Sequence, residues 1–145
     1  DLAAMAITYG HVYVAQIAMG ANIMQTIKAL QEAESYDGPS VVIAYSPCIE
    51  HGIGGGLANH QQQQRDAVAC GYFNLFRYDP RMEQSEQGPM LIDSKEPDYD
   101  LFKKFLLSEN RFSQLFNINQ EHAEELVDAC RDDAIKRRKR LLKLG

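Results

Sequence analysis

The chain has 145 residues, of which 45% are hydrophobic and 24% are charged, and it carries a formal net charge of −5 at pH 7. This length predicts one domain with a sizeable core, and the composition excludes a wholly disordered protein. The negative charge argues against a nucleic-acid-binding protein, which needs a positive field along its surface.

The cysteines and the start of the chain indicate its compartment. Three cysteines at wide spacings do not form the pattern of a disulfide framework, so we expect a reducing, cytoplasmic environment. No apolar stretch approaches the roughly 20 residues that cross a bilayer, and no basic flank of a secretory signal is present, so no membrane association is expected. The first residue is not methionine, and we expect the chain to be a piece of a longer polypeptide.

The first 35 residues predict a strand flanked by two helices. A short helix is expected over residues 2–8, and after Gly10 a β-branched and aromatic run over residues 11–18 is typical of a strand. Residues 21–35 place apolar side chains at steps of three and four, which predicts an amphipathic helix. Its N-cap is expected at Asn22 and its apolar positions are Ile23, Met24, Ile27, Leu30 and Ala33.

A continuous apolar run over residues 40–46, SVVIAYS, follows the turn SYDGPS. Such a run predicts a strand that is covered on both faces. The two strands and the helix between them form a βαβ unit, in which the strands run parallel.

After a glycine-rich loop, residues 57–70 are expected to form a helix whose tract NHQQQQRD is a solvated face. Strand candidates follow at residues 72–79 and 89–93, and helices at residues 100–108 and 119–144. The last helix carries an apolar stripe of Ala123, Leu126, Val127, Cys130 and Ala134. The alternation predicts an α/β fold of βαβ units with a mainly parallel sheet, ending in a long C-terminal helix.

Three further features resemble binding motifs, but each has a simpler interpretation. The basic run over residues 136–140 indicates a solvated helix end rather than a nucleic-acid patch, because the acidic residues upstream outweigh it. Cys48 and His51 have the spacing of a zinc pair, yet no second pair of that kind occurs. The glycines of HGIGGG lack both the Walker lysine and the dinucleotide spacing, so they indicate a flexible turn or a close backbone approach.

Cys48 is the candidate functional residue because of its position. It follows Pro47 where the second predicted strand ends, and ligands of open α/β sheets bind outside the carboxyl ends of the strands. On position alone a cysteine here is more often structural, and a nucleophile would need a base, for which only His51 is near in sequence. Cys70 and Cys130 are interpreted as small core residues.

Four stretches together resemble a known family: YGHVYVAQIAMGAN, ALQEAESYDGPSVVIAYSPCIEHGI, AVACGYFNLFRYDP and LIDSKEPD. They are similar to the C-terminal thiamine-diphosphate domain of the pyruvate:ferredoxin (flavodoxin) oxidoreductases. The similarity runs in order from Asp1 to about Phe112 and continues more loosely through the last helix. It implies the later half of a thiamine-diphosphate-binding fold over residues 1–115, with residues 116–145 as a C-terminal helix that packs on it.

The resemblance also implies an activity, cofactors and partners. Enzymes of this family oxidatively decarboxylate pyruvate with coenzyme A to acetyl-CoA and CO2, and they pass the electrons through iron–sulfur clusters to ferredoxin or flavodoxin. They use thiamine diphosphate and Mg²⁺ and act as large homodimers. By the same resemblance, Cys48 is one of the four thiolates that hold the 4Fe-4S cluster nearest the thiamine.

The sequence departs from the family pattern in ways that limit what this chain does alone. The diphosphate and magnesium motif and the other three cluster cysteines belong upstream of Asp1, and Glu50 stands where relatives usually carry Asn. No catalytic residue and no thiamine-diphosphate-binding residue is therefore assigned within the chain. We expect the isolated chain to be inactive, free of iron and without tight affinity for thiamine diphosphate.

Two alternatives stay open at the level of sequence. One is a small, separate protein that uses this half-domain as a non-catalytic assembly or interaction module. The other is a part of a different 2-oxoacid:ferredoxin oxidoreductase, because the residues that select the acid lie in other domains. The sequence also leaves open whether ferredoxin or flavodoxin accepts the electrons.

Overall fold

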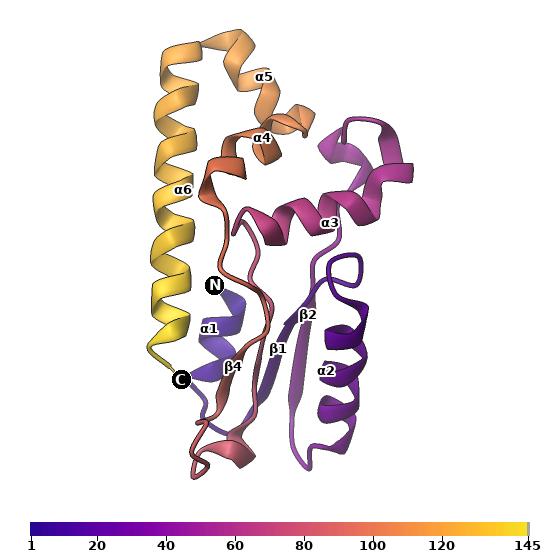
Figure 1. The fold of residues 1–145 in the computed structure, drawn as a ribbon, viewed down its shortest axis with the longest axis vertical. Helices are drawn as coiled ribbons and strands as arrows, with labels where there is room; N and C mark the ends of the chain where they lie inside the picture. The colour runs from indigo at the N-terminus through magenta and orange to yellow at the C-terminus, as the bar shows by residue number, and fades with distance from the viewer. Residues whose placement is uncertain (145) are drawn as a thin grey trace.

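The centre of the fold is a four-stranded sheet in the order β2-β1-β3-β4, seen in a computed structural model that describes residues 1–144 (Figure 1). The strands are β1 (Tyr13–Ile17), β2 (Ser40–Ala44), β3 (Phe76–Tyr78) and β4 (Met90–Ile92). β1 and β2 pair in parallel, whereas β3 runs antiparallel to both β1 and β4. Three of the four strands therefore point the same way. The predicted α/β class is confirmed, although only the β1–β2 pairing is parallel.

The helices of residues 1–144 lie around this sheet: α1 (Leu2–Ile7), α2 (Ile23–Ser35), α3 (His60–Ala69), α4 (Phe102–Leu107), α5 (Asn110–Ile118) and α6 (Gln120–Leu142). Each except α5 matches a predicted helix to within a few residues. Figure 1 shows α6 running along much of the long axis of the molecule, on the side away from α2. Within residues 1–144, none of these helices combines the length and the apolar character needed to cross a membrane.

The side chains of β1 alternate between two cores, one on each face of the sheet. The core toward α2 contains Tyr13, Ala15, Ile17 and Ala29. On the other face Val14 packs with residues of α1, β3 and β4, and Leu141 near the end of α6 reaches the same core. The period-2 alternation of a strand thus lets β1 serve both faces.

The apolar positions of α2 do not face the sheet. Asn22 caps the helix as predicted, because its side chain accepts a hydrogen bond from the N–H of Gln25. The face against the sheet carries Gln25, Thr26 and the small Ala29, which allows a close approach. Only Ala33 of the apolar stripe packs near the core. The others are exposed, at 48% for Ile23, 69% for Met24, 43% for Ile27 and 49% for Leu30.

β2 is an edge strand, and the prediction that it is covered on both faces holds in part. Val41 and Ile43 pack against the core on one face and Val42 against the core on the other, but all three are half-buried. Within the described residues it pairs only with β1, and its residues are exposed or half-buried. Contacts inside the chain therefore explain a part of the apolar character of this run.

Two residues of the glutamine tract are buried, which contradicts the predicted solvated face. Gln63 and Gln64 of α3 are only 4% and 2% exposed. The side-chain oxygen of Gln64 accepts a hydrogen bond of 2.7 Å from the N–H of Gly20. This bond joins α3 to the turn that follows β1, so the tract is partly a packing surface.

Arg138 is buried, although the basic run that contains it was predicted to be solvated. Its guanidinium donates to the side-chain oxygen of Asn74 at 3.1 Å and to the hydroxyl of Ser94 at 3.0 Å. Lys136, Lys139 and Arg140 of the same run are exposed. The end of α6 is therefore fixed to the segments around β3 and β4 by one arginine.

A buried ion network holds α2 against β3 and the end of β4. Arg77 of β3 donates to both carboxylate oxygens of Asp93 at 2.8 Å and to Glu32 of α2 at 2.6 Å. The hydroxyl of Tyr13 also donates to Glu32, at 3.0 Å. Burial and this bond raise the pKa of Tyr13. No local sequence pattern indicates such a network, because its members come from four separate segments.

Gly20 provides a test of the packing between the β1 turn and α3. A Cβ atom at this position would lie 2.7 Å from the backbone oxygen of Gln61 and 2.8 Å from its Cα. We predict that Gly20→Ala destabilises the chain by about 1–3 kcal/mol, measured by urea unfolding.

The matched control is Gly54→Ala, whose Cβ would meet only Ser108 at 3.6 Å. This variant should unfold at nearly the same urea concentration as the unmodified chain. Equal stability of the two variants would show that α3 does not press against the β1 turn.

Candidate functional site

Cys48 lies where the sequence predicts it, just beyond the carboxyl end of β2. The strand ends at Ala44, Pro47 is buried, and Cys48 is exposed at the start of the short 3-10 helix η1 (Ile49–His51). A buried proline before an exposed cysteine restricts the backbone that carries the thiol. The sulfur is thus presented at the surface from an ordered segment.

The glycines after Cys48 allow this loop to turn sharply and to approach α5. Gly52 has a φ of +64°, and a Cβ there would lie 2.6 Å from the side chain of Asn110. Gly55 and Gly56 also have positive φ values. The predicted close backbone approach is therefore confirmed, and it is made to the first residue of α5.

Backbone hydrogen bonds tie the glycine loop to the junction of α4 and α5. The N–H of Gly54 donates to the carbonyl of Ser108 at 2.9 Å, and the N–H of Asn110 donates to the carbonyl of Gly52 at 3.0 Å. Between them, Ile53 and Glu109 form an isolated antiparallel bridge. The loop is consequently held like a short strand along this junction.

The side chain of Glu109 is fully buried beneath the loop. Its carboxylate accepts a hydrogen bond of 2.6 Å from Nε of Arg111 and one of 3.0 Å from Nε2 of Gln63. Nδ1 of His51 lies 4.0 Å from the same carboxylate. A buried carboxylate requires such partners, and charge-assisted bonds are the strong ones. Glu109 therefore connects α3, α5 and the Cys48 loop.

Both histidines near the loop have structural contacts. Nδ1 of His51 is 3.4 Å from the backbone N of Cys48, and its Nε2 is 3.3 Å from Arg111. His60 contacts the hydroxyl of Ser46 at 3.4 Å and the amide of Gln64 at 3.2 Å. Among residues 1–144, no group of three or more His, Cys, Asp or Glu side chains could hold a metal ion. Cys48 is thus a single potential ligand.

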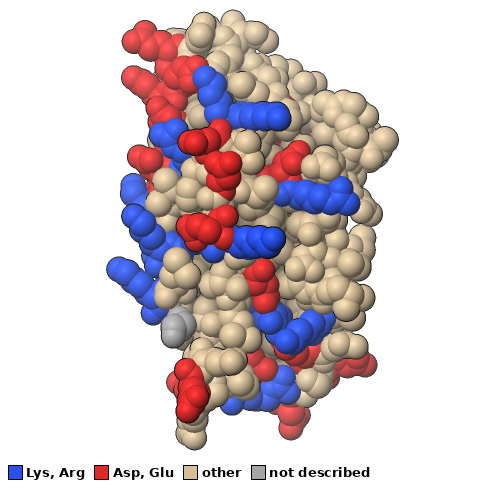
Figure 2. Space-filling view, viewed as in Figure 1, with Lys and Arg blue, Asp and Glu red and all other residues tan. Residues whose placement is uncertain are grey.

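The segment that contains Cys48 carries little charge, although Arg111 of α5 lies against His51. Residues 46–64 contain one charged side chain, that of Glu50, whereas Ile49 and Leu57 are 67% and 52% exposed. Figure 2 shows charged side chains gathered along α6, and few over the glycine loop at the upper right. The segment around the thiol therefore presents mainly uncharged side chains.

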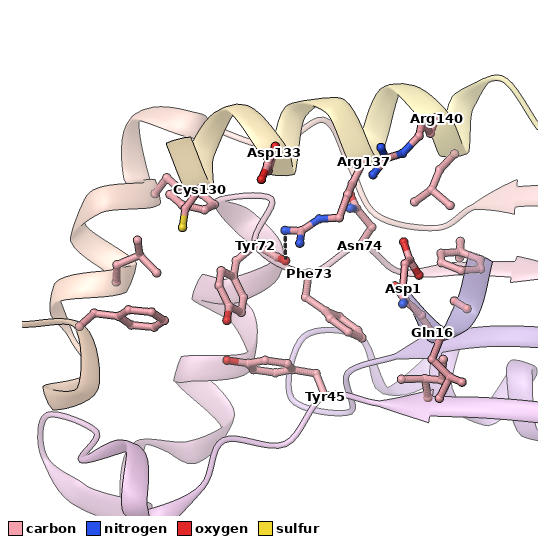
Figure 3. Close-up of a pocket in the computed structure, with 18 residues that line it drawn as sticks. Asp1, Gln16, Tyr45, Tyr72, Phe73, Asn74, Cys130, Asp133, Arg137 and Arg140 are labelled. Carbon is pink, nitrogen blue, oxygen red and sulfur yellow. Dashed lines mark hydrogen bonds between the residues drawn. The ribbon is translucent and has the colours of Figure 1, made fainter. Parts of the chain in front are cut away.

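The other two cysteines have different environments. Cys70 is buried, with its sulfur 3.5 Å from the carbonyl of Ala67, so the prediction of a core residue is confirmed. Burial raises the pKa of its thiol to about 11. Cys130 is exposed, and the same prediction for it is wrong. Its turn of α6 borders a cavity rather than a packed core (Figure 3).

That cavity has a volume of about 750 Å³ and lies between α6 and the face of the sheet that carries Ile43. Tyr45, Tyr72 and Phe73 form part of its lining, and Arg137 extends from α6 and donates to the carbonyl of Tyr72 (Figure 3). The hydroxyl of Tyr45 is buried without a hydrogen-bond partner, and burial raises its pKa.

Thiol labelling tests these assignments. Near pH 8, iodoacetamide should modify Cys48 and Cys130 of the folded chain but not Cys70, whose buried thiol stays protonated. Mass spectrometry before and after unfolding in urea measures the three sites separately. Labelling of Cys70 at the rate of Cys48 in the folded chain would contradict the arrangement.

Glu109→Ala tests the anchor of the loop. Loss of the carboxylate removes its bonds to Arg111 and Gln63, so we predict a loss of about 1.5–3 kcal/mol in unfolding free energy and faster proteolysis within residues 49–56. Glu109→Gln keeps one hydrogen-bond acceptor, so its loss in unfolding free energy should be smaller.

Glu125→Ala, at an exposed position of α6, serves as the control and should behave like the unmodified chain. If Glu109→Ala matched this control in both measurements, the buried carboxylate would not hold the loop.

No family model matches the chain, but several curated proteins do. It is 47% identical to the pyruvate-flavodoxin oxidoreductase of Enterobacter agglomerans over 137 residues, which are 94% of this chain and 12% of that protein. It is 44% identical to the pyruvate:ferredoxin oxidoreductase of Moorella thermoacetica over 145 residues, or 100% of this chain and 12% of that protein. It is 41% identical to the mitochondrial pyruvate dehydrogenase [NADP(+)] of Euglena gracilis over 94% of this chain and 8% of that protein.

The chain spans only 8–12% of the length of these three relatives. Nearly all of it takes part in each match, so the similarity covers both the sheet and the Cys48 loop. Along nearly its whole length, the chain is thus similar to one segment of enzymes named pyruvate:ferredoxin and pyruvate-flavodoxin oxidoreductases.

Proposed function

We propose that the chain is the segment of a pyruvate:ferredoxin (flavodoxin) oxidoreductase that supplies one thiolate, Cys48, to an iron–sulfur cluster. The observation that carries this proposal is the 44% identity over the whole chain to an enzyme of that name. The exposed position of Cys48 on an anchored loop supports it.

The proposed reaction belongs to the complete enzyme. Pyruvate loses CO2, its remaining two-carbon unit is oxidised and joined to the sulfur of coenzyme A, and ferredoxin or flavodoxin takes up the released electrons. Thiamine diphosphate, bound with Mg²⁺, supplies the electron sink for decarboxylation. The described residues hold no cluster of acidic side chains that could bind Mg²⁺, so its ligands are proposed to lie elsewhere in the enzyme.

The residues of this chain fit the role of a one-ligand contributor to a 4Fe-4S cluster. Such a cluster is ordinarily held by four thiolates, and Cys48 is the exposed thiol on the glycine loop. Gly56 has open space where a Cβ would lie, whereas the space beside Gly52 is filled by Asn110. Backbone hydrogen bonds of Gly52 and Gly54 hold the loop against the junction of α4 and α5, where Glu109 is buried, so the thiol keeps a defined position.

The choice of electron acceptor is proposed to lie outside this segment. Relatives named for flavodoxin, ferredoxin and NADP(+) all match it at 41–47% identity. The names of these relatives all specify pyruvate, which favours pyruvate over other 2-oxoacids.

We further propose that the complete enzyme is a cytoplasmic homodimer. In each copy, residues 1–115 form the later half of a thiamine-diphosphate-binding domain, and residues 116–145 pack on it.

Replacement of Cys48 in the complete enzyme tests the proposal. We predict that Cys48→Ala loses about four iron atoms per active site and the electron paramagnetic resonance signal of one cluster, while the signals of the other clusters persist. Release of CO2 in a first turnover should continue, because the electron sink belongs to thiamine rather than to the cluster.

Cys130→Ala is the matched control, since this thiol is also exposed but lies beside the cavity rather than on the loop. It should retain its full iron content. A complete set of cluster signals in Cys48→Ala would show that Cys48 is not a ligand.

A further inference from the structure

His51 contacts the Cys48 loop and α5 through both nitrogens of its ring. Nδ1 lies 3.4 Å from the backbone N of Cys48 and 4.0 Å from the buried carboxylate of Glu109. Nε2 lies 3.3 Å from Nη1 of Arg111. Within residues 1–144, the backbone N–H of Cys48 has no other hydrogen-bond partner. The position of the proton on this ring therefore decides whether that N–H is bonded inside the chain.

The two contacts of the ring with Cys48 and Arg111 cannot both be hydrogen bonds. A guanidinium and a backbone N–H only donate, so each contact needs an unprotonated ring nitrogen as its acceptor. A neutral imidazole offers one such nitrogen, because the other carries the proton. The single acceptor of His51 therefore serves either Arg111 or the N–H of Cys48.

The charges around the ring assign this acceptor to Arg111. The guanidinium is held by a bond of 2.6 Å from its Nε to Glu109, and a charged donor binds an acceptor more strongly than a neutral amide does. Nε2 of His51 then accepts from Arg111, and the proton lies on Nδ1. The carboxylate of Glu109 favours the same arrangement, because it attracts a proton on the nitrogen that faces it. Two donors then face each other at Cys48, so its N–H has no acceptor in this chain.

We propose that the N–H of Cys48 donates to a sulfur atom of the iron–sulfur cluster, and that His51 is a positioning residue that keeps this N–H free by carrying its proton on Nδ1. This rests on the proposed function, namely that Cys48 is a cluster ligand. Reduction of a 4Fe-4S cluster adds one electron and no proton, and in the proposed reaction the electron comes from oxidation of the two-carbon unit. A donor to sulfur stabilises the added negative charge, so it raises the reduction potential.

Two amide side chains of different length at position 51 test the proposal in the complete enzyme. The longer one, in His51→Gln, reaches the position of Nε2, accepts from Arg111 and leaves the N–H of Cys48 free. The shorter one, in His51→Asn, reaches only the position of Nδ1, where its oxygen captures that N–H. We predict that His51→Asn lowers the equilibrium constant for reduction of the cluster about tenfold, or by about 59 mV for a one-electron couple, whereas His51→Gln keeps the value of the unmodified enzyme.

The measurement is a redox titration that follows the electron paramagnetic resonance signal lost in Cys48→Ala. A lower potential in His51→Asn alone supports the proposal. A lower potential in His51→Gln alone would overturn it by showing that Nδ1 accepts from Cys48, and equal potentials in the two variants would also overturn it. If Cys48→Ala lost no signal, the proposed cluster ligand itself would fail, so the two failures are distinguishable.

Amide hydrogen exchange on the unmodified complete enzyme provides a second measurement. The N–H of Tyr45 donates to the carbonyl of Ile17 at 2.9 Å and is the slow control, and the exposed Asp37 is the fast one. We predict that the amide of Cys48 exchanges slowly while the cluster is bound and as fast as that of Asp37 after a chelator removes the iron, with Tyr45 slow in both states. Exchange at Cys48 that is fast with iron bound, or that stays slow without iron, would overturn the proposal.

Discussion

The arrangement of the candidate site depends on one buried carboxylate. Glu109 has no exposed surface, yet it lies at the junction of α4 and α5 directly beneath the glycine loop. Its bonds to Arg111 and Gln63 satisfy the negative charge. An unpaired carboxylate at this depth would be strongly unfavourable, so α3, α5 and the loop are constrained to meet there. Because the loop begins at Cys48, this constraint also determines where the thiol is presented.

A single thiol on a rigid loop has limited chemistry by itself, and its surroundings indicate a shared site. The loop carries little charge, exposes Ile49 and Leu57, and brings no further cysteine near Cys48 within the described residues. β2, the strand that leads to Cys48, has a free edge, and Tyr45 directly after it borders the cavity. In the complete enzyme that we propose, other parts of the polypeptide would cover the surfaces that this chain leaves open and would supply the remaining cluster ligands.

Local sequence patterns were sufficient to predict much of the fold. The N-cap at Asn22, the strand that begins near Tyr13 and the position of Cys48 follow from residue types and spacing that act over a few residues. The buried roles of Gln64, Arg138 and Glu109 could not be predicted in this way, because each depends on a partner more than 40 residues away. The predictions for the apolar stripe of α2 and for Cys130 were wrong for another reason. Periodicity shows that a face is apolar, but not whether this chain supplies the surface that covers it.

The central claim is that the sulfur of Cys48 is bonded to iron in the complete enzyme. X-ray diffraction measured at the iron absorption edge on crystals of that enzyme locates each iron atom directly. We predict an anomalous peak within bonding distance of the Cys48 sulfur, with the loop held over Glu109. A cluster ligated entirely by other residues, with the Cys48 sulfur out of bonding range of every iron, would contradict it.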